Sequence, residues 1–177
     1  MITIGVDPGL HGAIAVYDAA AGAILEILDM PTFETLIGKK ARLRIDKAQL
    51  LHEVGRIRAR YSPAFVTIEE LVAPPPIDKR SGRKRSNGAG GLLAQGRVYG
   101  EIEMAFAGFR YRIEYAHPAT WKARLRAPAL KSASVARADE LFPAYGKLWR
   151  GPCGGALADR AEAAMIAKYG ADTWLTK

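Results

Sequence analysis

Residues 2–18 read ITIGVDPGLHGAIAVYD, and this stretch decides the fold class. Residues 2–6 form a nearly unbroken apolar run, which is typical of a buried strand, and the run stops at the turn signal Asp7-Pro8-Gly9. Two more strand-like runs follow at residues 12–17 and 23–29, with a turn of small residues between them. The N-terminal segment therefore predicts an antiparallel meander of three strands.

Helices and strands alternate in the rest of the chain. An amphipathic helix is predicted over residues 43–60, because leucine, valine and isoleucine recur there at helical spacing. Strands are predicted over 64–68 and 110–115, and helices over 92–106, 118–125, 132–141 and 157–169. This order predicts an α/β fold with a mixed five-stranded sheet, three strands antiparallel and then two parallel, and helices on both faces. The length suits one domain over residues 1–177.

The composition is that of a globular protein, with 49% hydrophobic and 25% charged residues, and it argues against a disordered or fibrous chain. No apolar run approaches the ~20 residues that a membrane span needs, and the N-terminal residues lack a signal-peptide pattern. The single cysteine, Cys153, cannot form an internal disulfide. We therefore expect a cytoplasmic protein that has no membrane partner.

The excess positive charge is confined to one part of the chain. The 26 basic and 18 acidic residues give a net charge of +8. Residues 78–150 hold 15 of the basic and 6 of the acidic residues, and the densest cluster is DKRSGRKRSNGAGG at 78–91. A basic, glycine- and serine-rich loop at about residues 72–91 is typical of a flexible arm that meets nucleic-acid phosphates. A solvated loop with spare charge and a targeting signal are alternative interpretations.

Acidic side chains stand at the ends of two predicted strands and at the start of a predicted helix. Asp7 and Glu69 each follow a buried strand directly, and open α/β sheets bind ligands beyond such strand ends. Strand alternation lets only one of Glu69 and Glu70 face a site there, and we choose Glu69, the first acid after the run. Asp159 and Glu162 are three residues apart and share one face of their helix. Acids are also common at strand ends, and a helix dipole favours them on a first turn.

Four converging carboxylates would repel each other and raise their pKa values unless cations neutralise them. Ligands that are all oxygen suit Mg²⁺ or Mn²⁺ and exclude a typical zinc site. Two such ions about 3.5–4 Å apart stabilise the attacking and leaving oxygens when a phosphodiester is displaced in line. An acidic metal site together with a basic phosphate-binding arm therefore predicts a metal-dependent nuclease.

Four segments resemble the landmark segments of RuvC-type Holliday junction resolvases. They are IGVDPGLHGAIAVYD, VTIEELV, AQGRVYGEIE and ADRAEAAMIA, which follow one another in the family's order between Ile2 and about Tyr169. The resemblance implies an RNase H-like fold and a metal-activated water as nucleophile. It implies two Mg²⁺ ions, with Mn²⁺ as a substitute, held by Asp7, Glu69, Asp159 and Glu162. The family more usually has Asp at the position of Glu162, and Glu reaches one methylene further.

The resemblance also implies a DNA substrate. Lys122 and Lys131 match basic residues of the family and are candidates to contact the scissile phosphate. In the family, the loop after the second acid carries the residues that open the junction core. In this chain that loop has no obvious aromatic wedge, so we expect it to bind phosphates through Arg80, Arg83, Lys84 and Arg85.

Resolvases of this type act as symmetric homodimers on four-way junction DNA, in recombination, repair or phage DNA processing. The expected location is therefore the cytoplasm of a bacterium or of a phage-infected host cell. Our candidate for the dimer face is the helix at 92–106, where Val98, Ile102 and Phe106 form one stripe. Packing of this stripe on its own sheet is the alternative. Trp121 and Trp149 are interpreted as core residues rather than as base-stacking platforms.

The leading hypothesis is a Mg²⁺-dependent endodeoxyribonuclease that resolves four-way junctions. A second enzyme hypothesis is an RNase H-like nuclease with another substrate, such as an RNA–DNA hybrid, a flap or a structured RNA. An actin-like ATPase shares the strand-turn start, but it needs two lobes and a much longer chain. A basic DNA-binding module without catalysis is the last alternative, and the presence of all four acids argues against it.

Overall fold

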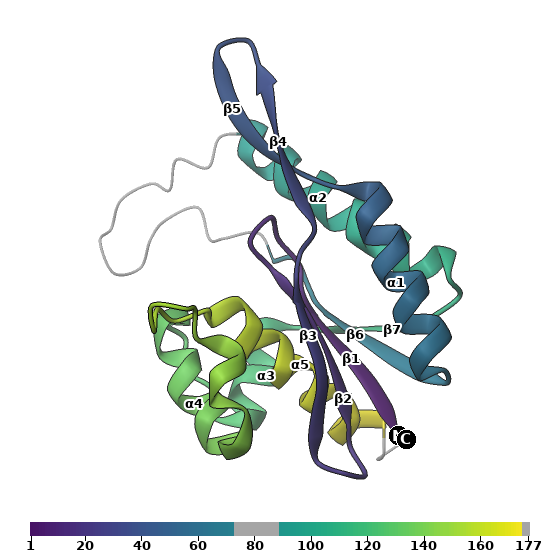
Figure 1. The fold of residues 1–177 in the computed structure, drawn as a ribbon, viewed down its shortest axis with the longest axis vertical. Helices are drawn as coiled ribbons and strands as arrows, with labels where there is room; N and C mark the ends of the chain where they lie inside the picture. Colours follow the sequence, from purple (N-terminus) through teal and green to yellow (C-terminus); the bar gives the residue numbers. More distant parts are fainter. Residues whose placement is uncertain (73–88, 175–177) are drawn as a thin grey trace.

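The computed structural model describes residues 1–72 and 89–174, and its centre is a five-stranded sheet in the order β3-β2-β1-β6-β7 (Figure 1). The strands are β1 Ile2–Asp7, β2 Ala13–Asp18, β3 Ala23–Asp29, β6 Ala64–Glu69 and β7 Arg112–Ala116. The pairs β1–β2 and β2–β3 are antiparallel, whereas β1–β6 and β6–β7 are parallel. The predicted sheet of three antiparallel and then two parallel strands is confirmed.

Helices cover both faces of this sheet, as the sequence predicts (Figure 1). On one face lie α1 Lys47–Tyr61 and α2 Ala89–Gly108. On the other lie α3 Pro118–Leu125, α4 Ser134–Leu141 and α5 Ala158–Trp174, with short 3₁₀ helices at Lys131–Ala133 and Pro143–Trp149. Within the described residues, no helix combines the length and the apolar character that crossing a membrane requires.

A second, two-stranded sheet was not predicted. It consists of β4 Thr32–Ile37 and β5 Lys40–Ile45, which form an antiparallel hairpin that projects beyond the main sheet (Figure 1). The prediction of a helix from residue 43 is therefore wrong at its start. Residues 40–45 alternate basic and apolar side chains, which is the strand period. The helix begins after Asp46, whose side chain accepts a hydrogen bond from the Gln49 backbone N–H at 3.0 Å.

The apolar stripe of α2 packs inside its own chain. Ile102 and Phe106 are fully buried in the cluster that α1 and α2 form with the sheet, and Val98 packs against the same cluster. The alternative interpretation, packing on the chain's own sheet, is confirmed for Ile102 and Phe106, whereas Val98 is only partly buried and a dimer contact through this helix stays a prediction.

Close packing of α5 on the sheet positions the functional residues. On β1, Ile4 and Val6 face α1 and α2, so alternation turns Gly5 toward α5. A Cβ atom at Gly5 would lie 2.2 Å from the backbone oxygen of Ala163 and 2.2 Å from the backbone nitrogen of Ala167. The missing side chain therefore lets the α5 backbone rest directly on β1.

Candidate metal centre

Asp7 and Glu69 lie side by side at the carboxyl ends of two parallel strands. Val6 of β1 pairs with Ile68 of β6, so the next residue of each strand lies at the same edge of the sheet. Val6 and Ile68 face α1 and α2, and alternation therefore turns Asp7 and Glu69 toward α5. Glu70 is exposed, so the structure brings Glu69 and not Glu70 to this edge.

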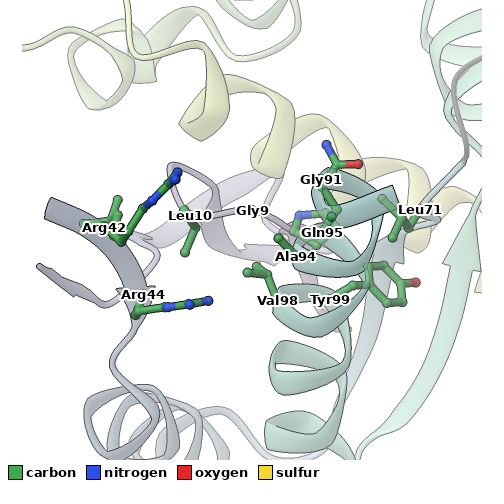
Figure 2. Close-up of a pocket in the computed structure, with 13 residues that line it drawn as sticks. Gly9, Leu10, Arg42, Arg44, Leu71, Gly91, Ala94, Gln95, Val98 and Tyr99 are labelled. Atoms are coloured by element: carbon green, nitrogen blue, oxygen red, sulfur yellow. The ribbon is translucent and has the colours of Figure 1, made fainter. Parts of the chain in front are cut away.

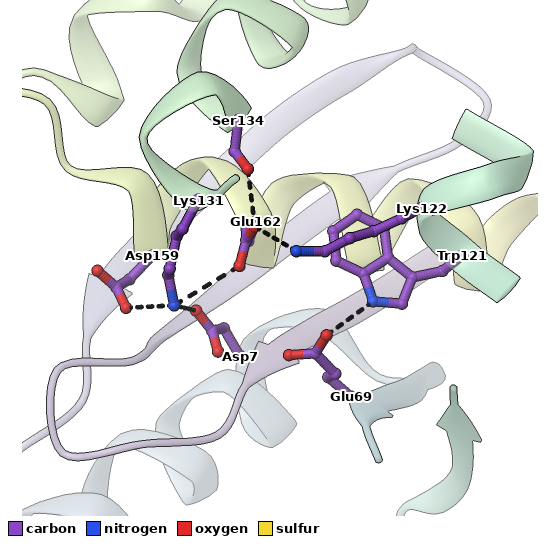
Figure 3. A network of polar contacts seen from close by, with 8 residues as sticks. All are labelled: Asp7, Glu69, Trp121, Lys122, Lys131, Ser134, Asp159 and Glu162. Carbon is purple, nitrogen blue, oxygen red and sulfur yellow. Dashed lines mark hydrogen bonds and ion pairs between the residues drawn. The ribbon is translucent and has the colours of Figure 1, made fainter. Parts of the chain in front are cut away.

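Glu162 of α5 completes a group of three carboxylates. One carboxylate oxygen from each of Asp7, Glu69 and Glu162 lies within 4.8 Å of the other two (Figure 3). Asp7 and Glu162 are almost completely buried, with 5% and 2% of their surface exposed. Asp159 lies near the start of α5, outside this group of three, and its side chain is 32% exposed.

The ammonium group of Lys131 lies between the carboxylates. Its Nζ atom is 2.8 Å from Asp7 Oδ2, 2.7 Å from Asp159 Oδ1 and 3.5 Å from Glu162 Oε2 (Figure 3). Lys131 begins the short 3₁₀ helix before α4, and it connects Asp159 to the other acids. The four predicted acids are thus brought together, three directly and the fourth through this lysine.

Electrostatics at the cluster favour a bound cation. Burial raises the pKa of Asp7 from 3.8 to about 7, although Lys131 opposes the rise. Burial also raises the pKa of Glu69, and repulsion from Glu162 adds to that effect. Burial alone would lower the pKa of Lys131, but attraction to Asp7 and hydrogen bonds to Asp159 and Asp7 raise it above its usual range. A positive charge among these oxygens therefore stabilises the ionised carboxylates.

Hydrogen bonds from neighbouring side chains orient two of the carboxylates. The Trp121 indole donates to Glu69 Oε1 at 3.0 Å (Figure 3). Ser134 Oγ and Lys122 Nζ donate to Glu162 Oε1 at 2.7 Å and 2.9 Å. The second oxygen of Glu69 and the Oε2 of Glu162 are thereby directed to the shared space. Fixing of a ligand by a neighbour of this kind is typical of metal sites in proteins.

Sequence reasoning missed the contacts made by Trp121 and Ser134. Trp121 is fully buried, as predicted for a core residue, but its ring nitrogen faces Glu69. Its one sequence signal is its place directly before Lys122, a predicted phosphate ligand. Ser134 has the chemistry of a helix cap, yet its hydroxyl bonds to Glu162 instead of a backbone amide.

The predicted DNA-binding residues divide into two groups. Lys122 and Lys131 both lie at the acidic cluster, where each pairs with Glu162. The predicted phosphate ligands of the basic loop lie outside the described residues; they are Arg80, Arg83, Lys84 and Arg85.

No protein-family model and no curated protein matches the chain. Solved structures do match. Thermus thermophilus RuvC is 15% identical with a TM-score of 0.54, over 98% of this chain and 97% of that one. T. thermophilus RuvC in complex with a Holliday junction substrate is 13% identical with a TM-score of 0.55, over 98% and 96%. Fowlpox virus resolvase with its substrate Holliday junction DNA is 15% identical with a TM-score of 0.48, over 99% of both chains. The predicted resemblance to RuvC is confirmed at the level of the fold.

Proposed function

We propose that this chain is a metal-dependent endonuclease that resolves four-way DNA junctions. The observation that carries the proposal is the convergence of three carboxylates from β1, β6 and α5, two of them buried and one half-buried, beside a lysine ammonium. This cluster stands in a fold shared over almost the whole chain with T. thermophilus RuvC, which has also been solved with a Holliday junction substrate. The fold supplies the substrate class, and the cluster supplies the chemistry.

The carboxylates fit divalent metal ions. Asp7, Glu69 and Glu162 offer only oxygen ligands within 4.8 Å of one another, and Asp159 lies beside them across Lys131. These four residues would hold two Mg²⁺ ions, for which Mn²⁺ would substitute. When bound, such ions stabilise developing negative charge at a phosphodiester and activate water for attack.

The chain's own side chains prepare the site for this chemistry. Trp121 and Ser134 hold Glu69 and Glu162 in fixed orientations, so that each presents one oxygen to the shared space. Lys122 and Lys131 place two positive charges at the mouth of the cluster, where they would contact oxygens of the phosphate to be cut. Each lysine would then release its carboxylate contact in favour of the substrate.

The proposed protein is one domain that acts as a symmetric homodimer in the cytoplasm, with a basic loop at about residues 72–91 that binds junction phosphates. A two-fold dimer would place one acidic cluster at each of two equivalent strands. Sedimentation of the protein with and without a four-way junction checks this: the expected species is two chains on one junction, and one chain on one junction contradicts the dimer.

A panel of nucleic acids tests the function. We expect Mg²⁺-dependent paired nicks at symmetric positions on two strands of a synthetic four-way junction, with little cutting of linear duplex. Preferential cutting of an RNA–DNA hybrid, a flap or a structured RNA would assign the same site to another substrate. Junction binding without cutting in either Mg²⁺ or Mn²⁺ would leave only a DNA-binding module.

Replacement of Lys131 by methionine should destabilise the protein in chelator. Without this ammonium, Asp7, Asp159 and Glu162 lose their shared cation, so we expect the melting temperature to fall by roughly 3–8 °C. Added Mg²⁺ should raise the melting temperature of the variant more than that of the parent. Junction cleavage should fall by about 10²-fold.

The matched control is Lys147→Met, since Lys147 is exposed and pairs with no acid in the described part of the chain. Equal effects at both lysines would contradict the assignment.

Replacement of Trp121 by phenylalanine should weaken metal binding. The variant keeps an aromatic ring in the core but loses the hydrogen bond to Glu69, so we expect Mn²⁺ affinity to fall by about tenfold. Titration followed by electron paramagnetic resonance of free Mn²⁺ measures this directly. Trp149→Phe is the control, because Trp149 is equally buried but its indole donates to Asp139. If both variants bind Mn²⁺ as the parent does, Trp121 has no positioning role.

A further inference from the structure

A cavity of about 820 Å³ opens between the β4–β5 hairpin, α2 and the turn after β1 (Figure 2). None of the residues that line it belongs to the candidate metal centre. The turn that forms one wall, Pro8 to Leu10, directly follows Asp7, so the cavity lies next to the acidic cluster along the chain. Its size is in the range of cavities that bind small organic ligands.

Two arginines give one wall a strong positive charge. Arg42 and Arg44 are two residues apart on β5, so both side chains lie on one face of the hairpin, and both extend into the cavity (Figure 2). Neither makes a hydrogen bond or an ion pair with any described residue, whereas Arg56 of α1 pairs with both Glu26 and Glu53. Among the described residues, none that lines the cavity is acidic. Guanidinium groups that have no acidic partner favour the binding of an anion, and a phosphate group matches their planar geometry well.

The other residues that line the cavity are uncharged, and most of them are apolar. Leu10, Leu71 and Val98 provide aliphatic surface, Tyr99 adds an aromatic ring, and Gln95 offers an amide (Figure 2). Free phosphate would leave this surface unused, and a purely apolar ligand would leave the arginines unused. A nucleotide has both parts, since its base covers apolar surface while its phosphates bind arginine.

We infer that this cavity binds an unstacked deoxynucleotide of the DNA strand that enters the metal centre, with Arg42 and Arg44 on its phosphates. The inference rests on the proposed function, and it adds that the strand is held by a specific nucleotide site beside the point of cutting. Pro8 lines the cavity and directly follows Asp7, so a DNA strand held at the metal centre would pass next to the cavity. The hairpin that carries the arginines is then a substrate-binding element.

Binding of a short oligothymidylate, measured by fluorescence anisotropy in chelator, tests the inference without requiring cleavage. The variant is Arg42→Gln with Arg44→Gln, and the control is Lys39→Gln with Lys40→Gln. The control removes the same charge from the same hairpin, at residues outside the cavity. We expect affinity to fall at least about tenfold in the arginine variant and clearly less in the lysine variant. Melting temperatures check that both variants are folded.

Two further probes define the ligand. An abasic oligomer of the same length should bind the parent about tenfold more weakly than oligothymidylate, and thymidine monophosphate should compete only weakly. The inference is overturned if the arginine and lysine variants lose the same affinity for oligothymidylate. It is also overturned if the parent binds the abasic oligomer as tightly as oligothymidylate, because binding would then be general electrostatic attraction. Junction cutting by the parent is assayed in parallel. If the parent cuts the junction but the arginine variant binds oligothymidylate as tightly as the parent does, this inference alone is overturned. If the parent does not cut the junction, the proposed function is overturned.

Discussion

Replacement of Asp7 by asparagine is expected to abolish Mg²⁺-dependent cleavage of a four-way junction, by at least about 10³-fold, which corresponds to about 4 kcal/mol of transition-state stabilisation. Asparagine keeps the shape of the side chain but removes the negative charge that would bind a metal ion. Of the three close acids, the variant would then retain Glu69 and Glu162. Junction binding should remain, because the basic residues of the chain are unchanged.

The same substitution should make the protein more stable in chelator. Burial raises the pKa of Asp7 from 3.8 to about 7, so the folded protein prefers the neutral form. The stability that neutral Asp7 contributes is complete below about pH 4 and is lost as the pH rises from 3.8 to about 7. Asparagine stays neutral throughout, so its advantage should be largest above about pH 7, on the order of 1–4 kcal/mol, and should shrink as the pH falls.

Urea unfolding of parent and Asp7→Asn at several pH values, with and without Mg²⁺, measures both effects. Mg²⁺ should stabilise the parent and leave the variant almost unchanged. Normal cleavage by the variant would remove Asp7 from the site. A pH-independent difference in the free energy of unfolding would contradict the buried, weakly ionised state of this carboxylate.

Replacement of Gly5 by alanine is expected to cost at least about 3 kcal/mol of folding free energy. The added Cβ atom would lie 2.2 Å from backbone atoms of Ala163 and Ala167, and the backbone of a buried helix cannot move aside cheaply. Any variant that still folds must shift α5 away from β1. Because α5 carries Glu162 and β1 carries Asp7, that shift would also separate the two carboxylates and reduce cleavage.

Gly96→Ala on α2 is the matched control. A Cβ atom there meets nothing within 4 Å, and alanine favours a helix interior over glycine by about 1 kcal/mol, so this variant should be slightly more stable than the parent. Urea denaturation monitored by circular dichroism gives both free energies. A Gly5→Ala protein as stable as the parent would mean that α5 does not lie on β1 as closely as the structure has it.

The sheet and its acidic ends could be predicted because they depend on local sequence. An apolar run that stops at Asp7 indicates a strand end, and Glu69 was chosen over Glu70 because it is the first acid after the second buried run. The boundary between β5 and α1 was predicted wrongly, because one apolar residue fits both the two-residue period of a strand and the 3.6-residue period of a helix. Leu43 was assigned to the helix that contains Leu50, but it belongs to a strand that ends before Asp46. The same error placed Arg44 on a helix, so its position beside Arg42 on one face of a strand was not predicted.

Contacts between distant segments could not be predicted from local sequence. Trp121 and Glu69 are 52 positions apart, and Lys131 and Asp7 are 124 apart, so only the folded chain shows that they meet. What covers the stripe of α2 could not be predicted either, because helical spacing shows which residues share a face and not what packs against it. Packing of Phe106 against the chain's own sheet decides that question.

The claim on which the account depends is that the acidic cluster holds divalent metal ions, and a crystal soaked in Mn²⁺ tests it most directly. The predicted result is strong anomalous density within coordination distance of Asp7, Glu69 and Glu162, with the Lys131 ammonium moved away from Asp7. The contradicting result is a cluster without anomalous density in which Lys131 still bridges Asp7 and Asp159.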